Sequence, residues 1–157
     1  MSKINNILFV CMGNTARSPA AEYLAKYYAQ KYGLNLHIES AGFFNAFTYM
    51  QPQSSSYLYQ KQIDHSNFRP QTINRALLER FDLIITMEKS HKRDIINSYG
   101  DIKGIKDKLY TLKEFNGAQN TDIIDPYYAS SQTYSKILEI IDENVENLIL
   151  KIYDMND

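Results

Sequence analysis

Short apolar runs alternate along the chain with stretches of helical periodicity. Residues 6–11 and residues 81–87 form largely continuous apolar runs, which are typical of strands buried on both faces of a parallel sheet. Residues 34–40 alternate between apolar and polar positions, and residues 108–112 form a further short run of strand character. The pattern therefore predicts four strands.

Between these runs, the spacing of apolar residues is helical. Ser18 is a suitable N-cap, Pro19 fits the first helical position and Gly33 suits a helix end, which predicts a helix between them. Glu22 is placed to complete a capping box with Ser18. Further helices are predicted over residues 52–62, 72–80, 89–99 and 131–153, and residues 43–53 and 116–124 are expected to be loops.

Alternating strands and helices in a chain of this length indicate an α/β fold. We expect one domain over residues 1–157, with a Rossmann-like, four-stranded parallel sheet and helices on both faces. Ligands of such sheets bind beyond the carboxyl ends of the strands, where the strand order reverses. Cys11 follows the first strand at such an end.

Composition and charge exclude several classes of function. The chain has 17 Lys+Arg and 18 Asp+Glu, without a basic stripe, so we expect no nucleic-acid partner. No apolar run approaches the roughly 18 residues of a membrane span, and no secretory signal is evident, so we expect no membrane and a cytoplasmic location. Cys11 is the one cysteine, which excludes an intramolecular disulfide and an all-cysteine metal site.

The segment from Cys11 to Arg17 carries the strongest chemical signal. Five residues separate a cysteine at a strand end from an arginine at a helix start, enough for a loop whose backbone N–H groups bind a tetrahedral oxyanion such as phosphate. The planar guanidinium of Arg17 can bind two phosphoryl oxygens at once. Both features favour the thiolate form of Cys11, which predicts that it is a nucleophile.

Other residues of this segment suit the same function. Gly13 lets the backbone approach an anion closely, and Asn14 tolerates the left-handed conformation that an inward-curling loop requires. Ser18 can donate a hydrogen bond to the sulfur of Cys11. A structural thiol beside a solvated arginine is the plainer alternative, and a rhodanese-type sulfur carrier is a second one, but Arg-Ser-Pro opening a helix matches that carrier poorly.

Expelling a phenolate or an amine requires a proton donor, and hydrolysis of a phosphoenzyme requires a base. Asp125 lies in the loop before the last helix and could serve both steps, because Pro126 restricts it to an extended conformation. Tyr127 and Tyr128 would then line the mouth of the site, where an aromatic wall can stack on a phosphorylated ring.

In these features the chain resembles the low-molecular-weight protein tyrosine phosphatases. The resemblance runs from the Cys11 loop through Ser40-Ala41-Gly42 and residues 82–87 to Asp125-Pro126-Tyr127-Tyr128. It implies a protein-tyrosine-phosphatase, a hydrolase that forms a cysteinyl-phosphate intermediate without a metal or another cofactor. Cys11, Arg17 and Asp125 are the implied catalytic residues, and Met12, Gly13, Asn14, Thr15, Ala16, Ser18, Phe47, Tyr127 and Tyr128 are the expected substrate-binding residues. Tyr49 is a second candidate, beside Phe47, for the wall opposite Tyr127.

The implied partners are a phosphorylated protein and the tyrosine kinase that modifies it.

Two positions depart from the family pattern. Ala16 stands where many relatives have a second cysteine, so a protective disulfide with Cys11 is impossible and peroxide inactivation should be poorly reversible. Many members support the loop asparagine with a histidine, whereas Phe68 or a neighbour stands there in this chain and His65 lies slightly upstream.

Thr15 raises an alternative substrate. Tyrosine-directed members usually have a bulky aliphatic residue at this position, whereas members that act on phosphoarginine have threonine. The pair Tyr127-Tyr128 follows the tyrosine-directed pattern, since arginine-directed relatives tend to have one aromatic residue followed by glycine. We favour phosphotyrosine, with protein phosphoarginine as the alternative substrate.

Two further functions are alternatives for a chain with this loop. An arsenate reductase of this fold would need an external thiol, because Cys11 is the one cysteine of the chain. A non-catalytic phosphate-binding module would be expected to lack Cys11, Arg17 or Asp125, and all three are present. The sequence therefore favours an enzyme.

Overall fold

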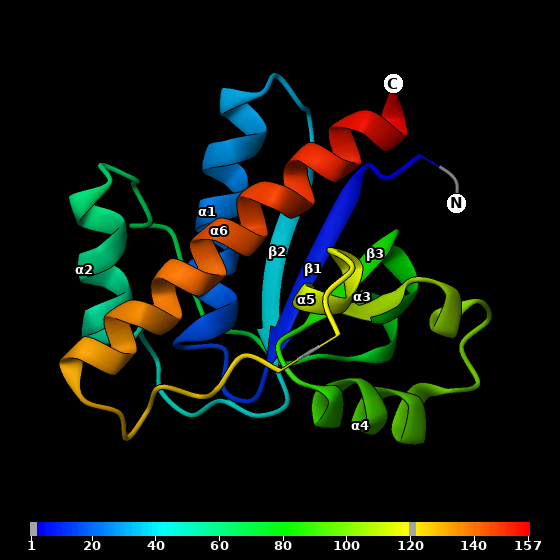
Figure 1. Ribbon diagram of the computed structural model, residues 1–157. Coiled ribbons are helices and arrows are strands. Elements are labelled where there is room, and N and C mark those ends of the chain that lie inside the picture. The colour runs from blue at the N-terminus through cyan, green and yellow to red at the C-terminus, as the bar shows by residue number, and fades with distance from the viewer. Residues whose placement is uncertain (1–2, 120–121) are drawn as a thin grey trace.

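The computed structural model describes residues 3–119 and 122–157 and contains a parallel sheet covered by helices on both faces (Figure 1). The sheet has four strands in the order β2-β1-β3-β4. These strands are β1 (Asn6–Cys11), β2 (His37–Gly42), β3 (Leu83–Thr86) and β4 (Leu109–Thr111). The predicted fold class is confirmed, and each predicted strand is present: β1 has the predicted boundaries, and those of the other three are shifted by one to three residues.

The described helices are α1 (Arg17–Lys31), α2 (Pro52–Gln60), α3 (Arg75–Arg80), α4 (Lys89–Tyr99), α5 (Leu112–Phe115) and α6 (Ser131–Asn156). A 3₁₀ turn at Ile105–Asp107 precedes β4. In Figure 1, α6 crosses in front of α1 and the sheet, whereas α4 lies below β3, at the lower right of the view.

Side chains of β1 alternate between two cores. Ile7 and Phe9 pack with residues of α1 and α6, whereas Leu8 and Val10 pack with residues of α3 and α4 on the other face. Both faces of the strand are thus removed from water, which explains why its sequence is continuously apolar. The apolar repeat predicted in the last helix is also buried: Ile137, Leu138, Ile141, Val145, Leu148, Ile149 and Ile152 are each at most 5% exposed.

Three local predictions need correction. Ser18 is not the N-cap of α1, because the helix begins at Arg17 and Ala16 takes the cap position without a side-chain hydrogen bond. The helix expected over residues 72–80 starts only at Arg75, where Asn74 caps it by accepting a hydrogen bond from Leu77 N at 2.9 Å. The short helix α5 was not predicted, although a capping box of Thr111 and Glu114 marks its start.

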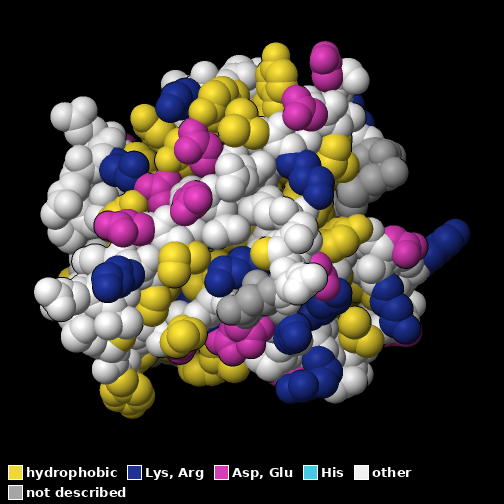
Figure 2. All heavy atoms as spheres, in the orientation of Figure 1, with side chains coloured by type: hydrophobic (Ala, Val, Ile, Leu, Met, Phe, Trp, Pro, Cys, Tyr) yellow, Lys and Arg dark blue, Asp and Glu magenta, His cyan; other side chains and the backbone are white. Residues whose placement is uncertain are grey.

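The surface seen in Figure 2 mixes positive and negative side chains, in keeping with the balanced composition. Hydrophobic side chains also reach the surface at the lower left of this view. Within the described ranges, 3–119 and 122–157, no helix combines the length and the apolar character that a membrane span requires.

The strand order places the site. β1 pairs with β2 on one side, from Asn6 opposite His37 to Cys11 opposite Gly42, and with β3 on the other side. The connections from the carboxyl ends of β1 and β3 therefore diverge, which is the arrangement that opens a crevice in sheets of this kind. Cys11, the last residue of β1, lies at this edge.

Candidate active site

The loop after Cys11 curls tightly, and two glycines, Gly42 and Gly13, leave the space that this curl requires. Asn14 has a φ of +52°, in the left-handed region that asparagine tolerates. A Cβ atom on Gly42 would lie 2.8 Å from the backbone nitrogen of Asn14 and 2.9 Å from the carbonyl carbon of Gly13, so this strand end must be glycine. A Cβ atom on Gly13 would lie 2.8 Å from that of Ala46, so this glycine admits the neighbouring loop.

A chain of hydrogen bonds leads from the sulfur of Cys11 into the core. The hydroxyl of Ser18 lies 2.9 Å from Sγ of Cys11, the contact expected from the sequence. Nδ2 of Asn14 donates to the hydroxyls of Ser18 at 2.8 Å and of Ser40 at 2.9 Å, and Ser40 donates to Glu22 at 2.6 Å. When Cys11 is a thiolate, Ser18 alone can supply the proton of the first contact, which stabilises the negative sulfur.

Asn14 is held without a histidine. Its Oδ1 accepts a hydrogen bond from the backbone N–H of Gln71 at 3.0 Å, and its Nδ2 is engaged by the two serines. His65 instead contacts the hydroxyl of Ser55 at 2.6 Å, and the ring of Phe68 packs edge-on against Tyr23. Ser40 and Gln71 therefore take over the support that many relatives obtain from histidine.

Glu22 ends this chain as a buried carboxyl. Burial raises its pKa, and hydrogen bonds from Lys26 and Ser40 offset part of that increase. Glu22 does not complete a capping box, because its two oxygens bind Ser40 at 2.6 Å and Lys26 at 2.7 Å. The residue instead ties α1 to the end of β2 behind the loop.

Arg17 is buried, with 2% of its surface exposed, and is anchored on one side. Its Nη1 donates to Oε2 of Glu88 and to the carbonyl of Ile123, both at 2.5 Å. Both contacts engage Nη1. The other edge of the guanidinium, formed by Nε and Nη2, has the geometry that binds two oxygens of an anion. Sequence reasoning missed Glu88, although its position shortly after β3, at the edge where Cys11 lies, was a signal.

A cavity of about 320 Å³ opens above Cys11 and brings together residues from distant segments. It is lined by Cys11, Met12, Gly13, Thr15, Ala16, Arg17, Phe44, Ala46, Phe47, Gln51, Asp125, Tyr127 and Tyr128. Phe44, Ala46 and Gln51 were not predicted, because residues 43–53 have no periodicity. Asn14 and Ser18 do not line the cavity and lie behind the loop, where they form the hydrogen bonds described above.

Asp125 reaches the cavity from the segment before α6. Its side chain is half exposed, and Oδ2 lies 3.8 Å from Nη2 of Arg17. Oδ1 accepts a hydrogen bond from the backbone N–H of Tyr127 at 3.1 Å, which closes a tight turn over Pro126. A carboxyl is thus held beside the arginine and at the rim of the cavity, where it could exchange a proton with a leaving group.

Aromatic side chains form the rim. The rings of Phe47 and Tyr127 are stacked, with centroids 5.8 Å apart and an interplanar angle of 17°. Tyr49 packs on the far side of this contact, with its ring centroid 5.6 Å from that of Phe47. Tyr128 is 97% exposed and lies beside Tyr127. Two segments about 80 residues apart therefore meet at the mouth of the cavity.

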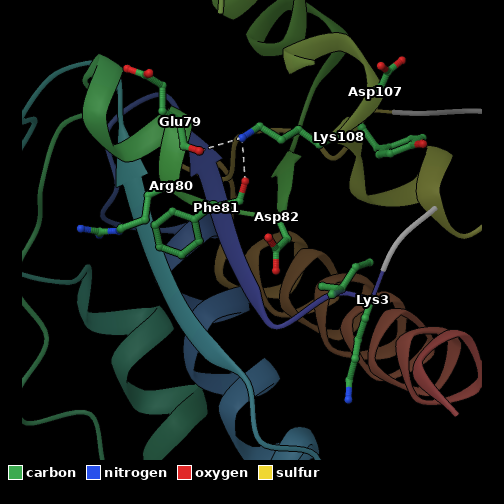
Figure 3. Close-up of a pocket in the computed structure, with 9 residues that line it drawn as sticks. Lys3, Glu79, Arg80, Phe81, Asp82, Asp107 and Lys108 are labelled. Atoms are coloured by element: carbon green, nitrogen blue, oxygen red, sulfur yellow. Dashed lines mark hydrogen bonds between the residues drawn. The ribbon is translucent and has the colours of Figure 1, made fainter. Parts of the chain in front are cut away.

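A larger cavity of about 530 Å³ lies at the opposite end of the sheet, mostly among residues that precede the strands (Figure 3). Its lining mixes both charge signs. Nζ of Lys108 donates to the carbonyls of Glu79 at 3.2 Å and Phe81 at 2.7 Å, so this ammonium group holds the end of α3.

Comparison with known proteins agrees with this geometry. Residues 6–156 match the family described as low molecular weight phosphotyrosine protein phosphatase. The chain is 34% identical over 144 residues to a protein-arginine-phosphatase of Bacillus subtilis, covering 91% of this chain and 93% of that relative. It is 35% identical over 136 residues to the low molecular weight protein-tyrosine-phosphatase PtpB of Staphylococcus haemolyticus, covering 85% and 89%.

Solved structures are similar over almost the whole chain. A mutant of YwlE from Bacillus subtilis superposes with a TM-score of 0.86 and 33% identity, covering 95% of this chain and 99% of that protein. A low molecular weight protein tyrosine phosphatase from T. tengcongensis superposes with a TM-score of 0.85 and 32% identity, covering 94% and 99%.

Proposed function

The chain belongs to the low molecular weight phosphotyrosine protein phosphatase family and is a cysteine-dependent phosphatase; from this premise we propose that its substrate is phosphotyrosine in proteins. The observation that carries the proposal is the aromatic rim of Phe47, Tyr127 and Tyr128 above a cavity that contains Cys11. We further propose that residues 1–157 act as one phosphatase domain in the cytoplasm, on proteins modified by a tyrosine kinase.

In the proposed first step, the thiolate of Cys11 attacks phosphorus and the bond from phosphorus to the phenolic oxygen breaks. Asp125 gives its proton to the departing oxygen, while Arg17 and the loop N–H groups bind the non-bridging oxygens. In the second step, water attacks the cysteinyl phosphate, Asp125 accepts a proton, and the sulfur leaves as a thiolate that Ser18 stabilises. The products are phosphate and the free tyrosine side chain.

The rim limits how a phenyl ring enters. Aromatic contacts need about 3.5–4.0 Å between carbon atoms on each face, so a ring held between two others requires about 7 Å. The centroids of Phe47 and Tyr127 are 5.8 Å apart. We propose that the substrate ring packs against this stacked pair from the cavity side and does not slide between its two members.

Phosphoarginine is the second candidate, and Thr15 favours it. Thr15 lines the cavity and is 3% exposed, and in this alternative its side chain lies beside the leaving group. A threonine there offers space and a hydroxyl to a polar group such as a guanidinium. The B. subtilis relative named a protein-arginine-phosphatase is similar over 91% of the chain.

Turnover of matched phosphotyrosine and phosphoarginine peptides in one assay tests the proposal, with Cys11→Ser as the inactive control. We expect faster turnover of phosphotyrosine, and we expect Thr15→Ile to leave or improve that rate while abolishing turnover of phosphoarginine. Preference for phosphoarginine in the unaltered protein would establish the second candidate. Activity on neither peptide would direct the test to arsenate reduction with an added thiol.

A further inference from the structure

Glu88 and His91 form a second layer behind Arg17 that the proposed steps do not use. Oε2 of Glu88 accepts the hydrogen bond from Nη1 of Arg17 at 2.5 Å, and the same oxygen lies 3.7 Å from Nε2 of His91. One oxygen thus faces both side chains. Any force that draws it toward His91 weakens its contact with Arg17.

The surroundings of His91 favour the neutral form of its imidazole ring, because the ring is buried and one of its nitrogens has no described hydrogen-bond partner. It lies in α4, is 1% exposed, and packs its ring 5.7 Å from that of Phe43. Its Nδ1 is buried without a hydrogen-bond partner among the residues that the structure describes. A neutral ring with its proton on Nε2 leaves only a lone pair at Nδ1, whereas a protonated ring would bury an unsatisfied donor there.

Charged groups face His91 from each surrounding segment. Burial lowers the pKa of His91, and Arg17 at the start of α1 lowers it further. Glu88 before α4, Asp94 within α4 and Asp122 from the segment before Asp125 act in the opposite direction. The net result is a pKa below the ordinary value of 6.5, so His91 is neutral at pH 7 and above.

We propose that neutral His91 is a positioning residue for Arg17, acting through Glu88. While His91 is neutral, Oε2 of Glu88 remains turned to Nη1 of Arg17 and the guanidinium edge stays directed at the anion. When His91 takes up a proton, it draws Oε2 away and repels the guanidinium, so oxyanion binding weakens. This inference rests on the proposed function, because it assigns Arg17 to the phosphoryl oxygens of the substrate.

Sulfate binding to the whole protein tests the inference without turnover, so its failure can be distinguished from failure of the proposed function. Sulfate remains a dianion from pH 8 to pH 5, and its dissociation constant can be measured from the NMR shifts of the backbone amides of residues 12–17. The ¹⁵N shifts of His91 report its protonation in the same samples. The variants are His91→Phe, which keeps a ring beside Phe43, and His91→Gln.

His37→Gln is the matched control. His37 is a histidine that also faces a carboxylate, with Nε2 2.5 Å from Oε2 of Glu39, but it is exposed and stands at the opposite end of the sheet. Its replacement removes one histidine without touching Glu88 or His91 behind Arg17.

From pH 8 to pH 5 we expect sulfate binding to weaken about fivefold more in the wild type and His37→Gln than in either His91 variant, at the low end of typical coupling between two sites. The proposal would be overturned if the sulfate dissociation constant depended on pH equally in the wild type and in His91→Phe. This outcome includes the case in which His91 takes up no proton while the protein is folded. Tighter sulfate binding on acidification in the wild type alone would also overturn it, because that result indicates simple attraction by a charged His91.

Discussion

Replacing Ser40 with alanine should destabilise the protein more at neutral pH than at acidic pH. The Ser40 hydroxyl accepts from Asn14 at 2.9 Å and donates to Glu22 at 2.6 Å, and all three side chains are buried. Ser40→Ala therefore leaves one amide hydrogen and one carboxylate oxygen without these partners. Each unsatisfied buried group costs about 1–3 kcal/mol, which predicts a loss of about 3 kcal/mol in the free energy of unfolding at pH 7.5.

The pH dependence follows from the charge of Glu22. Burial raises the pKa of Glu22 above 4.5, and the hydrogen bond from Ser40 lowers it in part. Removing Ser40 therefore penalises the charged carboxylate more than the protonated acid. As the pH falls through the raised pKa of Glu22 toward the pKa of this carboxyl in the unfolded chain, Glu22 becomes protonated in the folded state. The cost of Ser40→Ala should then shrink by about 1 kcal/mol.

Urea unfolding of wild type and Ser40→Ala at pH 7.5 and pH 5.0 measures both effects. Glu22→Gln supplies the control background, because the amide keeps an acceptor for Ser40 but does not titrate. In that background the cost of Ser40→Ala should be smaller and independent of pH. A cost that is the same at both pH values in the wild-type background would refute the role given to the Glu22 charge.

Three further changes have defined outcomes. Asp125→Asn should reduce kcat about 10²–10⁴-fold on phenyl phosphates with poor leaving groups and much less on those with good ones, because it removes the proposed proton donor. Equal losses across a leaving-group series would contradict that assignment. Gly42→Ala should cost about 1–3 kcal/mol and most of the activity, since its Cβ would overlap the backbone of Asn14, as thermal unfolding and turnover would show. Peroxide inactivation should be poorly reversed by dithiothreitol, because Cys11 has no neighbouring thiol at Ala16 to form a protective disulfide, and full recovery of activity would disprove this.

Features carried by contiguous segments were predictable from the sequence. The four strands follow from short apolar runs, and the boundaries of α4 were predicted without error. The loop from Cys11 to Arg17 was recognisable because its residues are neighbours in the chain, so their spacing alone sets how the backbone must curl. Even here Ser18 was misassigned as a cap, since its hydroxyl contacts the sulfur of Cys11 and the amide of Asn14.

The partners of those residues were decided by the tertiary structure. Glu88 is 71 positions from Arg17, and Ser40 is 26 positions from Asn14, yet each pair is in hydrogen-bond contact. Local spacing contains no information on such pairs. They meet because the parallel order β2-β1-β3 brings the carboxyl ends of three strands to one edge. The sequence by itself therefore determined the spacing of Cys11, the proposed nucleophile, and its loop, while the packing of the sheet determined what holds them in place.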